Sequence, residues 1–129
     1  MDDPDYRAIS ERISSLTTTS DDVRAVLGLL GHEWRQTNEP ESFGIVAIAP
    51  GRKLWSTAPR LDSADDFEKW ALAREETRLD DCGYDPVGGT YYFSCYDPKF
   101  GNDYGSSTRM GAAMWAAFVR LIGRVIDDE

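Results

Sequence analysis

Few residues in this sequence could carry out acid–base or nucleophilic chemistry, and their settings argue against catalysis. His32 is the only histidine, so any mechanism that needs two imidazoles is excluded. It follows Gly31 at the end of an expected helix, where a positively charged ring would interact favourably with the helix dipole. We therefore expect His32 to be a partner of the helix terminus and not a catalyst.

The two cysteines, Cys82 and Cys95, are too few for a disulfide framework and lack C-x-x-C spacing. Cys95 stands among aromatic residues of an expected strand, which is typical of a small core residue. Cys82 follows Asp80 and Asp81, whose negative charges disfavour a reactive thiolate. We expect two free thiols and no catalytic cysteine.

Metal and phosphate sites have no motif here. The segment from Asp97 to Asp103 places oxygen ligands around Gly101, but it lacks the ligand order and the closing Glu of a calcium loop. The sequence has no zinc ligand set and no glycine-rich phosphate loop, so we expect no cofactor. Asp97 and Asp103 would suit general acid–base work only if they were desolvated.

Acidic residues are the most distinctive feature. Net charge is −9, from 23 acids and 14 bases, which opposes binding to nucleic acid or to an anionic membrane. Residues 62–85 contain nine acids and three bases. Four of these acids crowd the C-terminal end of an expected helix: Glu75, Glu76, Asp80 and Asp81. The dipole at that helix end opposes negative charge. The acids are therefore either a solvated face or a surface presented to a positive partner.

Hydrophobic periodicity predicts the elements that would position these residues. Helices are expected from Asp3 to Leu16 and from Ser20 to Leu30, the first capped by Asp3 and the second by Ser20. A hairpin is expected over residues 43–49 and 54–58, followed by a helix from Ser63 to about Arg78. Residues 90–96 read as a central strand between two Asp-Pro turns, with a loop over 97–106 and a last helix over 108–126.

This order, ααββαβα, predicts one α+β domain over residues 1–129, with a small, mainly antiparallel sheet packed by helices. Helices on one face cannot bury both sides of Tyr91-Tyr92-Phe93. Exposed tyrosines beside acids are typical of protein-binding hot spots. The candidate binding residues are Glu75, Glu76, Asp80, Asp81, Tyr84, Tyr91, Tyr92, Tyr96, Phe100 and Tyr104.

The sequence thus favours a non-enzymatic, acidic protein-binding protein that occludes the basic site of a target. An immunity protein, an antitoxin-like protein or a phage anti-defence factor would act in this way. Two alternatives stay open: an accessory subunit of a phage or secretion assembly, and an enzyme or small-molecule binder that uses carboxylates. The acidic N-terminal residues are unlike a signal peptide and no apolar run is long enough to span a membrane, so we expect the cytoplasm.

Overall fold

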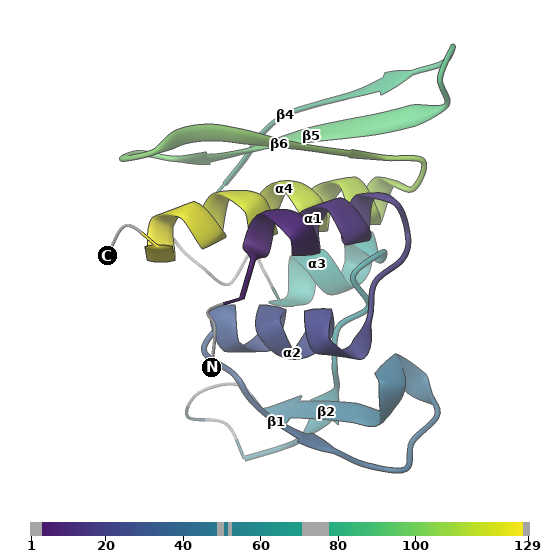
Figure 1. Ribbon diagram of the computed structural model, residues 1–129, viewed down its shortest axis with the longest axis vertical. Helices are drawn as coiled ribbons and strands as arrows, with labels where there is room; N and C mark the ends of the chain where they lie inside the picture. The colour runs from purple at the N-terminus through teal and green to yellow at the C-terminus, as the bar shows by residue number, and fades with distance from the viewer. Residues whose placement is uncertain (1–3, 49–50, 52, 71–77, 128–129) are drawn as a thin grey trace.

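The fold places two antiparallel sheets on either side of a group of helices (Figure 1). The computed structural model describes residues 4–48, 51, 53–70 and 78–127. The helices are α1 (Tyr6–Ser14), α2 (Ser20–Leu29), α3 (Ala64–Trp70) and α4 (Met110–Asp127), with a 3-10 turn η1 (Glu41–Gly44). The strands are β1 (Glu33–Gln36), β2 (Ile45–Ile48), β3 (Ser56–Thr57), β4 (Arg78–Asp85), β5 (Thr90–Asp97) and β6 (Gly101–Ser107).

The expected α+β class with antiparallel strands is confirmed, and most of the element order with it, but the strands form two three-stranded sheets where one small sheet was expected. Three strands were not expected. β1 pairs with β2, β4 occupies residues assigned to a helix end and a turn, and β6 occupies the expected loop over 97–106. The two Asp-Pro turns do flank the central strand, because β5 is joined to β4 and β6 through them.

The caps of the first two helices are displaced from their expected residues. Asp5 caps α1 by accepting the N–H of Ala8, and Thr19 caps α2 by accepting the N–H of Asp22. The Asp22 carboxylate in turn accepts the Thr19 N–H, which completes a capping box. Gly31 ends α2 as expected, with a φ of 78°.

Helix α4 is the centre of the core. Every residue from Gly111 to Val119 is buried, since α4 contacts β5 and β6 on one side and α1, α2 and α3 on the other. Trp115 and Phe118 stack edge-to-face against Phe67 of α3, and the Trp115 indole N–H donates to the Ser63 carbonyl at 3.1 Å. No described helix combines the length and apolar composition needed to cross a bilayer.

Strand β6 lies close to α4 because Gly105 has no side chain. A Cβ built at Gly105 would lie 2.4 Å from the backbone nitrogen of Ala117 and 2.6 Å from the carbonyl oxygen of Ala113. Neither backbone atom can move without shifting the helix. This contact fixes the distance between the sheet and α4.

We expect Gly105→Ala to lower the free energy of unfolding by about 2 kcal/mol or more, because overpacking here meets backbone. The matched control is Gly28→Ala in α2, where nothing lies within 4 Å of the added Cβ. That change should raise stability by about 0.5–1 kcal/mol through helix propensity. Urea unfolding of both variants measures the difference. Equal effects of the two changes would contradict the packing argument.

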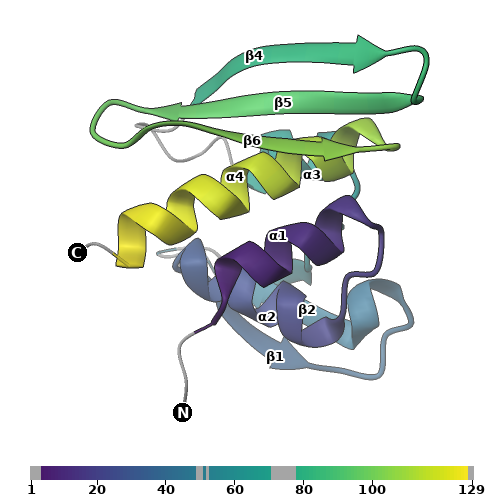
Figure 2. The same cartoon turned by 45° about the horizontal axis from the view of Figure 1, so that its top comes forward.

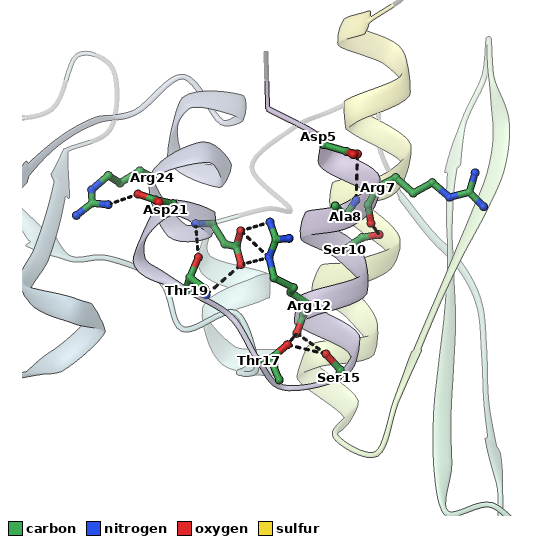
Figure 3. Close-up of polar contacts among 11 residues, drawn as sticks. Asp5, Arg7, Ala8, Ser10, Arg12, Ser15, Thr17, Thr19, Asp21 and Arg24 are labelled. Atoms are coloured by element: carbon green, nitrogen blue, oxygen red, sulfur yellow. Dashed lines mark hydrogen bonds and ion pairs between the residues drawn. The ribbon is translucent and has the colours of Figure 1, made fainter. Parts of the chain in front are cut away.

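A buried ion pair joins α1 to α2. Asp22 is 1% exposed, and the Arg12 guanidinium donates to both of its carboxylate oxygens, at 2.7 and 2.9 Å (Figure 3). Burial alone would raise the pKa of Asp22. The hydrogen bonds from Arg12 and from the Thr19 N–H outweigh burial and hold that pKa below its usual range.

Asp22→Asn should therefore lower the free energy of unfolding by about 2 kcal/mol at pH 7. This loss is smaller than the loss on breaking a fully buried ion pair, because the Arg12 side chain is 41% exposed. A carboxyl with a lowered folded pKa stabilises fully above its unfolded pKa of about 4 and loses this contribution as pH falls through the folded value. The gap between wild type and variant should thus narrow below about pH 4. Asp21→Asn, at a carboxylate that is 92% exposed, is the control and should change little.

Candidate functional site

The sheet of β4, β5 and β6 has one face packed on α4 and one face that no described helix covers (Figure 2). Register assigns each residue to a face, since side chains alternate along a strand. Gly105 lies against α4, and it pairs with Phe93, so this row is on the inner face. The rows on either side of it, through Tyr92 and Ser94, therefore lie on the outer face.

Three tyrosines lie together on this outer face. Tyr92 and Tyr96 are two residues either side of Ser94 in β5, and Tyr104 of β6 is the direct partner of Ser94. Their exposed fractions are 41%, 38% and 55%. Ser94 itself is 0% exposed, and its hydroxyl accepts a hydrogen bond from the Asn102 side-chain amide at 2.8 Å. Neighbouring side chains therefore cover Ser94. We name Tyr92, Tyr96 and Tyr104 the tyrosine face.

The remaining aromatic residues that we expected at a binding surface lie elsewhere. Tyr84 and Tyr91 pair across β4 and β5 on the inner face, with ring centroids 4.7 Å apart. Tyr91 is half-buried against the core, while Tyr84 is 53% exposed. Phe100 lies in the turn between β5 and β6 and also packs against the core. The expected cluster of six aromatic residues is therefore split between both faces and a turn.

The acidic residues follow a different element from the one expected. Asp80 and Asp81 do not end a helix, because they belong to β4. A bulge between Leu79 and Asp81 sets Asp80 out of register, and Asp81 pairs with Ser94 on the outer face beside the tyrosine face. Glu75 and Glu76 lie outside the described residues. The helix-dipole argument against these charges therefore does not apply to Asp80 and Asp81.

His32 lies at the end of α2, as expected, but in a setting that disfavours charge. Burial lowers its pKa, its ring stacks edge-to-face on Trp70 at 5.0 Å, and its buried Nδ1 has no hydrogen-bond partner in the part of the chain that is described. A favourable interaction with the helix terminus would need the imidazolium. His32 is therefore a neutral packing residue.

The candidate carboxylate pair is held in structural contacts. Asp97 accepts the backbone N–H groups of Lys99 and Phe100 and so forms the turn after β5. Asp103 forms ion pairs with Arg124, at 3.0 Å, and with Arg120, at 3.7 Å. These ion pairs connect β6 to α4. Within the described ranges no three His, Cys, Asp or Glu side chains gather to hold a metal ion.

A second surface was not anticipated from the sequence. An open cleft of about 790 Å³ lies between η1, β3, α3 and the connection from α1 to α2. Its lining includes Leu16, Ser42 and Phe43, the three described non-glycine residues with positive φ. Such backbone strain often gathers at functional sites. No sequence signal marks these residues, because none is of a type that favours this conformation.

The charged groups of the cleft are largely occupied. Asp66 accepts the backbone N–H of Arg60 at 2.7 Å, and Asp62 is paired with Arg109 at 3.2 Å and with Arg60 at 3.8 Å. These carboxylates stabilise the entry to α3. The cleft therefore offers shape and apolar surface more than a converging set of reactive groups.

Comparison with protein-family models, with curated proteins and with solved structures finds no match to this chain.

The two cysteines differ sharply in reactivity. Both are free thiols; Cys82 is exposed, and Cys95 is buried between β5 and α4. Burial, with a smaller contribution from the charge of Asp103, raises the pKa of Cys95 to about 12.

We expect iodoacetamide at pH 8 to add one label to the folded protein and two labels to the unfolded protein, as counted by mass spectrometry without reductant. Two labels on the folded protein would contradict the burial of Cys95, and Cys82→Ser should reduce the native count to none.

Proposed function

We propose that this chain is a small, non-enzymatic, acidic protein-binding protein that acts in the cytoplasm. It would occlude a basic surface of its target through the tyrosine face. The observation that carries the proposal is the open outer face of β4–β5–β6, where three partly exposed tyrosines lie side by side. A rigid sheet presents these rings with little conformational entropy left to lose on binding.

The composition of the face supports a protein partner. Tyrosine is enriched at binding hot spots because a large apolar ring and a hydroxyl act in one side chain. Asp81 lies on the same face, in the cross-strand row of Ser94 and Tyr104, and the chain carries a net charge of −9. A complementary positive surface on the partner would speed association and exclude other proteins. The acids would thus act mainly through association rate and the tyrosines through contact area.

The net negative charge of the chain favours protein binding over RNA binding. Open sheets with aromatic side chains also stack the bases of single-stranded RNA, but they do so within basic surroundings. A net charge of −9 opposes the phosphate contacts that supply most of that affinity.

The biological role that fits best is inhibition, as by an immunity protein, an antitoxin-like protein or a phage anti-defence factor. A non-inhibitory accessory subunit of a phage or secretion assembly would use the same face. The cleft favours the remaining alternative, a small-molecule binder, because its three positive-φ residues gather around one hollow.

The test uses the intact chain as bait in extracts of its native host, followed by kinetics on the partner so identified. Alanine at a true anchor among Tyr92, Tyr96 and Tyr104 should cost about 2 kcal/mol of binding free energy. Tyr84→Ala is the matched control, since Tyr84 is as exposed as Tyr104 but belongs to the other face. Binding that depends on Tyr84 and not on the tyrosine face would contradict the proposal.

A further inference from the structure

The side chain of Tyr92 lies across the open face of the sheet and over the neighbouring strand. Tyr92 pairs with Gly83 of β4. A Cβ built at Gly83 would lie 2.1 Å from both Cζ and Oη of Tyr92 and 2.4 Å from its Cε1. The phenol end of Tyr92 therefore occupies the space that a side chain at position 83 would fill. One side of the ring packs on the backbone of β4, and Tyr92 is still 41% exposed, so its other side is open.

Two carboxylates flank this ring. Asp81 and Asp85 lie two residues on either side of Gly83, at a spacing of about 7 Å along β4, and therefore on the same face as the Tyr92 ring. Their β5 partners, Ser94 and Thr90, belong to the outer face as well. Both aspartates are exposed.

Neither carboxylate has an ion-pair partner in the part of the chain that is described. Asp81 Oδ1 accepts the N–H of Cys82 at 2.9 Å, and Asp85 Oδ1 accepts the N–H of Val87 at 2.9 Å. These are local backbone contacts, and each uses one oxygen of the carboxylate. The negative charge and the second oxygen of each group remain available to a ligand.

Two of the cations near this sheet lie at its other end. Arg78 pairs with Tyr96, and Arg124 donates to the carbonyl of Phe100 in the turn between β5 and β6. Tyr96 is four residues from Tyr92 in β5, which corresponds to about 13 Å. These arginines therefore do not compensate the carboxylates beside Tyr92.

The cation closest to the other side of Tyr92 is already engaged. Arg120 lines the groove of about 510 Å³ beside β6 together with Tyr92, and it contacts Asp103 and the carbonyl of Tyr104. Across the same groove Glu11 is paired with Arg7, so the charges of these two pairs cancel. Among the described residues, the uncompensated charge next to the Tyr92 ring is that of Asp81 and Asp85.

An open aromatic ring beside uncompensated carboxylates is a site for a cation, and its geometry favours arginine. A guanidinium is planar and weakly hydrated, so it can stack on a ring and present its N–H edge to a carboxylate at the same time. The ammonium of lysine is a compact, strongly hydrated charge, and it lacks the fork that pairs with both oxygens of a carboxylate.

We propose that an arginine side chain of the protein partner stacks on the open side of Tyr92 and donates to the carboxylate of Asp81. Asp81 is chosen over Asp85 because it shares a cross-strand row with Tyr104 and so lies within the tyrosine face. Gly83 is the positioning residue, since its missing side chain lets the ring lie down on β4. This inference rests on the proposed function and names the group that the partner must present.

The probes are three capped tripeptides, Gly-Arg-Gly, Gly-Lys-Gly and Gly-citrulline-Gly, titrated against the intact chain while NMR follows the ring protons of Tyr92. Citrulline has the shape of arginine without its charge. We expect the arginine peptide to bind about threefold tighter than the lysine peptide and about tenfold tighter than the citrulline peptide. Equal affinity of any two peptides, or no shift of the Tyr92 ring with the arginine peptide, would overturn the proposal.

Gly83→Ala tests the seat of the ring without changing any charge. The added methyl meets the flexible end of the Tyr92 side chain and not backbone, so the fold should persist with the ring displaced. Affinity for the arginine peptide should fall about threefold or more. Binding equal to that of wild type would show that the stacked ring is not the site.

Asp81→Asn tests the carboxylate independently and should also weaken the arginine peptide about threefold. Its matched control is Glu68→Gln, which removes the same charge at an exposed position on α3 and should leave the affinity unchanged. An equal loss in both variants would indicate diffuse attraction to the net charge and would overturn the proposal.

The peptide titrations separate this inference from the proposed function. Dependence of the whole partner on Tyr92, Tyr96 and Tyr104 is measured by its own kinetics. A partner that needs these tyrosines, together with peptides that show no preference for arginine, would overturn the arginine contact alone.

Discussion

The burial of α4 on all sides between Gly111 and Val119 is the constraint on which the rest of the structure depends. A helix that is enclosed by a sheet on one side and by three helices on the other needs small residues wherever backbone approaches backbone. Alanine and glycine fill most positions from Gly111 to Ala117, while Trp115 and Phe118 fill the larger spaces beside α3. On the sheet, Gly105 meets the same requirement, because a residue without a side chain lets β6 approach the backbone of α4. Each layer is therefore placed by its distance from this one helix.

A sheet that lies against a single helix layer must leave its other face open. In this chain the open face carries tyrosine at three positions where serine or threonine would have given an ordinary solvated surface. The inner face meets a different requirement, because its polar groups are neutralised in place, as with Asp103 and its two arginines. The two faces therefore differ in that the inner face pairs its polar groups within the chain, whereas the outer face exposes tyrosine side chains.

Helices and the central strand could be predicted because their signals are local. Asp-Pro turns mark both ends of β5, and apolar spacing marks α1, α2 and α4. β4 and β6 escaped prediction because edge strands need little apolar alternation. β4 is acidic, and β6 is a Gly/Asn/Asp/Ser segment whose conformation depends on contact with β5 and α4. Of the candidate site, the tyrosines could be foreseen from their types, but their division between two faces depends on register, which no local pattern shows.

The position of α4 in the chain bears on how this protein assembles during synthesis. Every other described element precedes α4, yet β5, β6, α1 and α3 bury their apolar sides against it. The hydrogen bond from Ser107 to the Ser14 carbonyl, between residues 93 apart in sequence, joins the first helix to the segment that leads into α4. The ribosome therefore releases most of the chain before its central helix exists. Until then the earlier elements have no common surface on which to pack, so a nascent chain would rely on chaperones or on its net negative charge to avoid aggregation.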